Sequence, residues 1–150
     1  MNGMDVDLFF DTSVIVYAFD SSEVEKHSIA SKMIEKAMNE GNGVISSQVL
    51  LELYNVLTRF VTNPLPREDA ERIIKDFAGA SSWRKLDYGV STAVSAVETS
   101  VRLKTSIWDT LITETMKENN VYTIVTENEK DFKKIKGIKV INPFKKQAIK

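Results

Sequence analysis

The sequence contains no cysteine and a single histidine, and both scarcities limit the chemistry that the chain can perform. Without cysteine, neither a disulfide framework nor a thiolate metal site can form. With His27 as the one histidine, a zinc site built from several histidines is excluded as well. A bound metal would therefore be held by oxygen atoms, which favours Mg²⁺ or Mn²⁺.

Long hydrophobic runs are also lacking. No apolar stretch approaches the roughly 18 residues that cross a membrane as a helix, and residues 1–4 lack the basic and apolar regions of a signal peptide. We therefore expect a cytoplasmic protein with no membrane contact. An excess of charge of one sign is missing too, since 20 Lys and Arg residues oppose 21 Asp and Glu residues. A surface that binds nucleic acid would thus have to be a local one.

What the chain does contain is the composition of a soluble globular protein. Its 150 residues are 43% hydrophobic and 27% charged, which suits one ordinary domain with a real core. No repeat or linker divides it, and the turn at 63–66 is too short to separate domains. We expect a single domain over residues 1–150, with residues 1–3 and 145–150 disordered.

Apolar runs alternate with stretches of helical periodicity along the chain. We expect strands at 6–10, 44–46, 85–87, 121–125 and 138–141. We expect longer helices at 22–39, 47–62, 67–80, 90–103 and 107–118, and short helices beginning near residue 13 and ending near residue 135. Strands separated by helices indicate an α/β fold with a parallel sheet and helices on both faces. The carboxyl ends of the strands then open on one side of the sheet.

Asp11 comes directly after the apolar run of the first expected strand. It would therefore lie at the carboxyl end of that strand, where open α/β sheets hold their ligands. The alternative is that Asp11 merely caps the short helix beginning near Ser13.

Glu52 lies in a helix that we expect to follow a cap at Ser47 and to end near Thr62. At 100° per residue this helix has an apolar face of Val49, Leu53, Val56 and Phe60 and an adjoining polar stripe of Gln48, Asn55 and Arg59. Glu52 falls at the seam between them. It is either a carboxylate aimed along the edge of the core into a cleft, or a solvated one like most on helices.

Asp109 lies at the start of another expected helix. Ser106 and Asp109 match a helix capping pattern, with Asp in place of the usual Glu or Gln. Asp109 would also favour the positive end of the helix dipole, and this structural role is sufficient to explain it. A further polar cluster, 126–131, follows the strongly β-prone run at 121–125.

Five stretches resemble, in this order, the motifs of PIN-domain ribonucleases, and in size the chain looks most like the VapC-type toxins of prokaryotic toxin–antitoxin pairs. The first stretch is Asp11-Thr12-Ser13 followed by Val16, Tyr17 and Asp20, and the others are 46–52, 106–112, 126–132 and 137–143. Each motif is weak singly, but the ordered combination spans essentially the whole chain. The resemblance implies a three-layer α/β/α sandwich around a mostly parallel sheet of about five strands.

The resemblance also implies a metal site. Carried over to this chain, Asp11, Glu52 and Asp109 are the catalytic carboxylates that converge on Mg²⁺ or Mn²⁺. The fourth motif departs from the family pattern, because Asn128 stands where many relatives have Asp. Asn128 can still offer a carbonyl oxygen to the metal, and Asp131 becomes the expected fourth catalytic carboxylate and ligand. Glu127 and Glu129 are weaker substitutes.

The expected chemistry explains why carboxylates gather. Their mutual repulsion is relieved by a divalent cation, which also lowers the pKa of a water so that it can attack a phosphodiester without a side-chain nucleophile. The resemblance implies products with 5′-phosphate and 3′-hydroxyl ends. Thr12, Ser13 and Thr126 would orient ligands or water, or else serve only in turns and caps.

An RNA substrate also needs a cationic track, because an acidic cleft repels phosphate. The candidates are Arg59, Arg84, Lys85, Lys104 and Lys130, and each could equally be ordinary solubilising surface. Trp83 and Trp108 could stack on bases, although for Trp108 we favour packing in the core or in a dimer contact. His27 receives no catalytic role.

The sequence therefore supports the hypothesis of a Mg²⁺- or Mn²⁺-dependent endoribonuclease that is the toxin of a VapBC-type pair and has a cognate antitoxin as partner. The resemblance also implies a homodimer, with the apolar helices 24–37 and 49–60 available for dimer and antitoxin contacts. The alternative is a catalytically inactive PIN-like module that binds RNA or protein. A phosphatase with Asp11 as nucleophile ranks last, because Ser13 stands where such enzymes usually carry a second Asp.

Overall fold

The computed structural model describes residues 6–145 and contains a five-stranded parallel sheet in the order β3-β2-β1-β4-β5. The strands are β1 (Leu8–Phe10), β2 (Gly43–Ser46), β3 (Trp83–Leu86), β4 (Thr123–Val125) and β5 (Lys139–Ile141). The helices are α1 (Thr12–Phe19), α2 (Val24–Glu40), α3 (Ser47–Arg59), α4 (Arg67–Gly79), α5 (Val90–Leu103), α6 (Ile107–Glu118) and α7 (Glu129–Phe132). The predicted α/β fold with a parallel sheet is confirmed.

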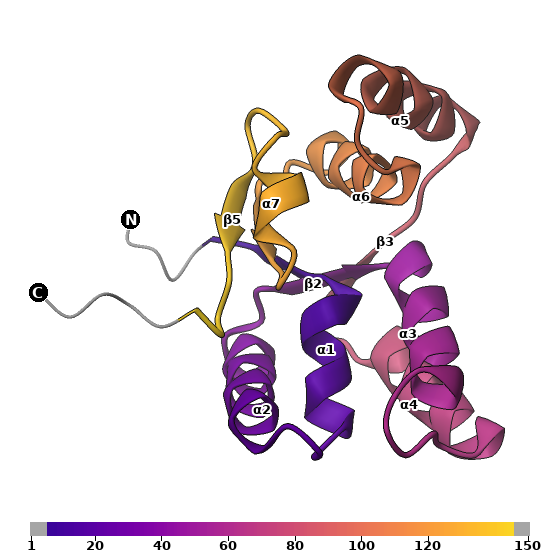
Figure 1. Ribbon diagram of the computed structural model, residues 1–150, viewed down its shortest axis with the longest axis vertical. Coiled ribbons are helices and arrows are strands. Elements are labelled where there is room, and N and C mark those ends of the chain that lie inside the picture. Colours follow the sequence, from indigo (N-terminus) through magenta and orange to yellow (C-terminus); the bar gives the residue numbers. More distant parts are fainter. Residues whose placement is uncertain (1–5, 146–150) are drawn as a thin grey trace, which may run out of the picture.

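Helices cover both faces of this sheet (Figure 1). On one face α1 packs against α2 and α3, and α3 packs against α4, while α5 packs against α6 on the other face. Strands β2 and β3 lie to one side of β1, and β4 and β5 lie to the other. The order therefore reverses between β1 and β4, and the crevice beyond the carboxyl ends of such a strand pair is where open α/β sheets place their ligands.

The centre of the sheet is fully buried, which is why its strands read as continuous apolar runs. Phe9 and Phe10 of β1 have no exposed surface. The ring of Trp83 packs edge-on against Phe10 and lies over Gly43, its register partner in β2. Since Trp83 is only 3% exposed, the prediction that it stacks on bases is wrong.

Both ends of α3 differ from the prediction. Ser46, not Ser47, is the cap, and its Oγ accepts a 3.3 Å hydrogen bond from the backbone N–H of Val49. The helix ends at Arg59, because the chain turns back and the N–H of Leu65 donates to the Leu57 carbonyl, which a longer helix would use itself. Phe60, expected on the apolar face, is consequently 67% exposed.

The remaining expectations concern the ends of the chain and membranes. The disorder expected at 1–3 and 145–150 falls outside the described range, apart from Lys145. Among residues 6–145, no helix combines the length and the apolar character that crossing a membrane requires.

Candidate functional site

Asp11 occupies the position before the first residue of α1, but its side chain does not cap that helix. Its Oδ2 instead accepts hydrogen bonds from Ser13 Oγ at 2.9 Å and from Thr126 Oγ1 at 2.7 Å. Thr126 follows β4, the strand that pairs with β1. Burial raises the pKa of the Asp11 carboxyl, although these hydrogen bonds oppose the shift. The carboxylate is therefore held firmly at the crevice between β1 and β4.

Glu52 turns toward the same crevice from α3. Its Oε1 accepts from Thr12 Oγ1 at 3.1 Å, and its Oε2 accepts from Gln48 Nε2 at 3.1 Å. The same Gln48 nitrogen donates to the backbone oxygen of Trp108 at 3.0 Å, which links α3 to the start of α6. Burial raises the pKa of Glu52, and the negative charge of Asp11 raises it further.

Asp109 lies in the first turn of α6, beside the crevice. Ser106 Oγ caps this helix by accepting from the N–H of Trp108. The carboxylate of Asp109 is turned toward Asn128, whose Nδ2 donates to Asp109 Oδ2 at 3.4 Å. Burial, together with the negative charges of Asp11, Asp131 and Glu52, raises the pKa of Asp109 to about 6. Three carboxylates other than Asp109 are thus close enough to act on it.

Asn128 stands between two of these acidic groups. Its Nδ2 donates to Asp131 Oδ2 at 3.2 Å as well as to Asp109, and its backbone N–H donates to Thr126 Oγ1 at 3.0 Å. The partial positive charge of this amide N–H group therefore offsets the negative charges of Asp109 and Asp131, at a position where a bound cation could do the same. To serve as the predicted metal ligand, Asn128 would have to turn its amide and present Oδ1.

The two other carboxylates of the fourth motif are occupied elsewhere. Glu127 accepts from the Tyr17 hydroxyl at 2.9 Å and from the ammonium of Lys26. Glu129 accepts from Asn142 Nδ2 at 3.2 Å and pairs with Lys133 at 3.3 Å, and these partners lower its pKa. Neither is free to join the group around Asp109, which leaves Asp131 as the acidic residue of this motif near the crevice.

The crevice itself is a hollow of about 390 Å³. It is lined by Asp11, Thr12, Ser13, Val16, Glu52, Asn55, Val56 and Asn128. Within residues 6–145, no three Asp, Glu or His side chains are already spaced as a cage for one ion. The donor chemistry nevertheless fits Mg²⁺ or Mn²⁺, because every donor is a hard oxygen and the negative charges of Asp11, Asp131 and Glu52 act together on Asp109.

The predicted basic residues fall into two groups. Arg84 donates to Asp7 and to the backbone oxygen of Asn119, and Lys85 donates to the backbone oxygen of Ala80. Asp7 precedes β1 and Ala80 precedes β3, whereas Asp11 follows β1. Arg84 and Lys85 are therefore engaged at the amino ends of the strands, on the opposite side of the sheet from Asp11. The other three, Arg59, Lys104 and Lys130, are exposed on segments adjoining the site.

Trp108 lies beside the site on the surface. It is 60% exposed, so the prediction that it packs in the core is wrong, while a dimer contact or base stacking stays a prediction. Sequence reasoning assigned no role to Gln48 or Lys26. For Gln48 the signal was present, because it lies one helical turn before Glu52. For Lys26, whose partner Glu127 is 101 positions away, no local pattern gave a signal.

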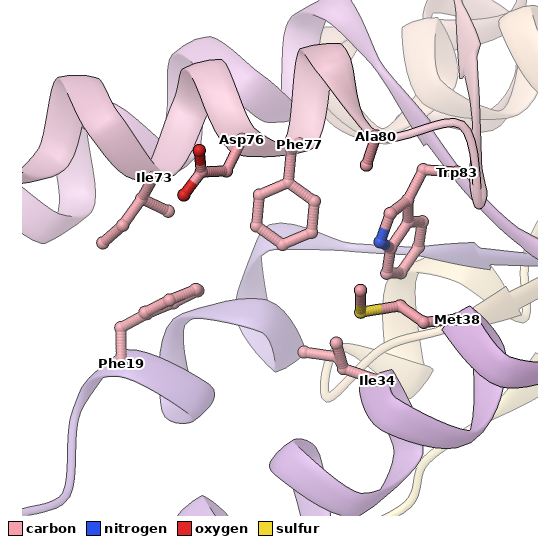
Figure 2. A pocket seen from close by; sticks show the side chains of 8 residues that line it. All are labelled: Phe19, Ile34, Met38, Ile73, Asp76, Phe77, Ala80 and Trp83. Atoms are coloured by element: carbon pink, nitrogen blue, oxygen red, sulfur yellow. The ribbon is translucent and has the colours of Figure 1, made fainter.

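A second hollow, of about 200 Å³, lies away from the carboxylates (Figure 2). Its walls come from the end of α1, from α2, from α4 and from Trp83 of β3. Figure 2 shows the rings of Phe19, Phe77 and Trp83 and the side chain of Met38 gathered around it. Asp76 is its one charged lining residue, so this hollow suits an apolar group.

The comparisons with known proteins agree with this arrangement. The family model of the PIN domain matches residues 8–138. VapC20 of Mycobacterium tuberculosis, a sarcin–ricin loop cleaving toxin, has a TM-score of 0.68 and 16% identity, covering 83% of this chain and 92% of its own. A toxin–antitoxin complex from Klebsiella pneumoniae has a TM-score of 0.64 and 19% identity, and the match covers 92% of this chain and 98% of the other. VapBC2 from Rickettsia felis, bound to a promoter DNA fragment, has a TM-score of 0.64 and 23% identity, and the match covers 91% of this chain and 98% of the other.

At these low identities, the solved structures show that the fold is shared and no more. A search of curated proteins found no match. The family model nevertheless spans the first four strands and ends at residue 138, directly before β5. The resemblance inferred from the ordered motifs is confirmed, and the chain belongs to the PIN domain family.

Proposed function

We propose that this chain is an endoribonuclease that depends on Mg²⁺ or Mn²⁺ and is the toxin of a toxin–antitoxin pair. One observation carries the proposal: Asp11, Glu52, Asp109 and Asp131 come from four different segments of the chain and lie close enough for the first, second and fourth to act on the charge of Asp109. Such a cluster of carboxylates costs stability and is typical of a functional site rather than of a structural one. Membership of the PIN domain family supports the same proposal.

In this mechanism Asp11, Glu52, Asp109 and Asp131 would hold the cation. When bound, the ion would supply a water of lowered pKa and would stabilise the negative charge that develops on the phosphate. Ser13 and Thr126 fix the Asp11 carboxylate by donating to it, and Thr12 and Gln48 fix Glu52 in the same way. A water molecule would form a new bond to phosphorus while the bond to the 3′ oxygen breaks. The leaving 3′ oxygen would take up a proton from the water, which gives a 3′-hydroxyl on one product and a 5′-phosphate on the other.

The test is cleavage of RNA by the purified chain with Mg²⁺, with Mn²⁺ and with EDTA. We expect cutting with either metal and none with EDTA. Asp11→Asn, Glu52→Gln and Asp109→Asn should each lower the rate by at least about 10²-fold, whereas Asp76→Asn, on the exposed side of α4, should not change it. A wild-type chain that binds RNA but cuts none under any divalent condition would favour the inactive binding module instead.

We propose an antitoxin as the protein partner. Two of the similar structures are a toxin–antitoxin complex and VapBC2 bound to promoter DNA. The apolar hollow of Figure 2 offers such a partner a place for a hydrophobic side chain, and α2, one of the two helices expected to make this contact, contributes Ile34 and Met38 to it. Expression of the chain should arrest growth, and co-expression of a small neighbouring gene encoding a DNA-binding protein should relieve the arrest. Met38→Glu should weaken that rescue without lowering RNA cleavage.

We also propose that the chain pairs with a second copy, and α5 is the best candidate surface. Its residues Val90, Val94, Val97 and Val101 form one stripe and are between 52% and 84% exposed. Their spacing of four and three is that of a helix–helix seam. Asp87 precedes the helix, whereas Arg102 and Lys104 lie at its end. An antiparallel pair of α5 helices would therefore bring opposite charges together, and a parallel pair would not.

A further inference from the structure

A polar stripe leads along α3 from the carboxylates to a cationic pocket. Glu52 and Arg59 are seven positions apart on this helix, so they lie on the same face, about 10 Å apart along the axis. Asn55 lies between them on that face. It also lines the crevice that holds Asp11 and Glu52, so the stripe is continuous with the candidate active site.

The pocket at the far end of this stripe has a volume of about 480 Å³. It is lined by Tyr54, Asn55, Thr58, Arg59 and Arg67. Arg59 ends α3 and Arg67 begins α4, so two helices contribute one guanidinium each. Asn55 lines both hollows, which means that the cationic pocket and the acidic crevice adjoin.

Neither guanidinium of this pocket is neutralised within residues 6–145, where no carboxylate oxygen lies within 4.0 Å of Arg59 or Arg67. Two other arginines differ, since Arg72 pairs with Asp69 and Arg84 pairs with Asp7. Two unpaired guanidinium groups that converge on one polar hollow form a site for an anion, because each can donate two hydrogen bonds to a phosphate or carboxylate.

An aromatic ring adjoins these cations. Phe60 is largely exposed, and the guanidinium of Arg59 lies 5.5 Å from the centroid of its ring. Grooves that bind single-stranded nucleic acid combine cations that follow the backbone with aromatic faces on which bases stack. The pairing of Arg59 with Phe60 therefore favours a nucleic-acid phosphate over a free anion or an acidic peptide.

We propose that Arg59 and Arg67 bind a phosphate of single-stranded RNA that flanks the bond to be cut, with Phe60 stacking on an adjacent base. This site rests on the proposed ribonuclease function and specifies how its substrate is held. The acidic crevice repels the RNA backbone unless cations elsewhere hold the strand. The stripe of α3 then sets the direction in which the strand leaves the crevice.

The test measures how the binding of a short, labelled, single-stranded RNA depends on salt, with Mg²⁺ present and Asp11→Asn in every variant to prevent cutting. Each phosphate contact contributes about 0.7 to the slope of log K against log salt concentration for a single strand. The double variant Arg59→Ala/Arg67→Ala, which releases this one phosphate, should lower the slope by about 0.7, and each single variant should lower it by less. Arg72→Ala, an exposed arginine of α4 paired with Asp69, is the matched control and should not change it.

A second readout uses the active chain. With Asp11 restored, the double variant should raise KM for RNA cleavage about tenfold or more while kcat stays within about twofold, because the arginines lie two helical turns from the carboxylates. If the wild type cuts RNA, but the double variant has the same salt dependence of RNA binding and the same KM as the chain with both arginines, the proposed phosphate site is wrong. The proposed ribonuclease function would then remain supported. If the wild type neither binds nor cuts RNA, the proposed function fails and this site falls with it.

Discussion

Thr126 Oγ1 lies 2.7 Å from Asp11 Oδ2 and donates a buried hydrogen bond to it across 115 positions of sequence. Thr126 also accepts from the backbone N–H of Asn128 at 3.0 Å. One hydroxyl therefore couples the first motif to the fourth, and it does so because β1 and β4 are neighbours in the sheet. The position of Asp11 depends on a residue that bears no charge.

Thr126→Val should remove both of these hydrogen bonds while preserving side-chain volume. The Asp11 carboxylate would lose its shortest side-chain hydrogen bond, so its orientation would loosen and its affinity for cations should fall by about 10–100-fold. Titration of Mn²⁺ by calorimetry measures the effect. Thr123→Val, at the start of the same strand, is the matched control and should leave the affinity unchanged. Equal affinities for both variants would contradict a role for Thr126.

The raised pKa of Asp109 makes stability depend on pH when metal is removed. Its pKa in the folded chain is about 6, above the ordinary value of 3.8. Between these values the folded state binds more protons than the unfolded state, so the free energy of unfolding should fall as pH rises from about 4 to about 6. Asp11 and Glu52, whose pKa values are also raised, act in the same direction.

Urea unfolding in EDTA at several pH values tests this dependence. Asp109→Asn should flatten the curve in part, because Asp11 and Glu52 remain. Mg²⁺ at 100 times its Kd should add about 2.7 kcal/mol to the free energy of unfolding. At one fixed Mg²⁺ concentration the gain should grow as pH rises through about 6, because Asp109 loses its proton there. A free energy of unfolding that rises from pH 4 to pH 6 in EDTA would show that the carboxylates do not crowd as described.

Asn128→Asp should separate the metal-free state from the metal-bound one. The substitution replaces an amide that donates to Asp109 and Asp131 with a third negative charge beside them. Without metal, the free energy of unfolding at pH 7 should fall by about 1–3 kcal/mol. With Mn²⁺, affinity should rise, because a charged oxygen replaces a neutral group. Thermal unfolding with EDTA and with Mn²⁺ gives both values, and a variant that loses stability equally in the two conditions would argue against a cation here.

Sequence reasoning could place Asp11 and Asp109 at one end of the sheet, because Asp11 comes directly after an apolar strand and Asp109 lies at a helix start. The details did not follow. Whether Asp11 caps α1 or faces the crevice is decided by Thr126, which no local pattern connects to it. The direction of the Asn128 amide likewise depends on Asp109 and Asp131 together.

Helical periodicity has a similar limit. The spacing of Val94, Val97 and Val101 indicates that they share a face, but it cannot say what that face contacts. In the structure α5 packs on α6 largely through threonines: Thr92 donates to Glu118, Thr99 to Glu114, and Thr110 to the backbone oxygen of Ala96. The valines are left outside. The apolar side of α5 is therefore its outer side.

Gly43→Ala tests the packing that holds β2 to β3. A Cβ at Gly43 would lie 2.5 Å from Cζ3 of Trp83, whose ring is buried against Phe10 and Phe77 and cannot move freely. The free energy of unfolding should fall by about 1–3 kcal/mol. Gly79→Ala is the control, because a Cβ there meets nothing within 4 Å. It should be neutral or stabilising, and two variants of equal stability would contradict this account.

The valine stripe of α5 should control self-association. Val94→Glu and Val97→Glu should each convert a dimer to a monomer in sedimentation equilibrium, because a charge would be buried in an apolar seam. Val24→Glu, which places the same charge on an exposed valine of α2, should leave the dimer intact.

Charge reversal gives the orientation of the pair. Asp87→Lys alone and Lys104→Asp alone should each weaken an antiparallel dimer by placing like charges opposite each other, and the two changes together should restore it. In a parallel pair each residue would instead face its own copy, so neither single change would introduce a new like-charge contact and the double variant would show no rescue. A wild-type chain that remains monomeric at every concentration would show that something other than a second copy covers these valines.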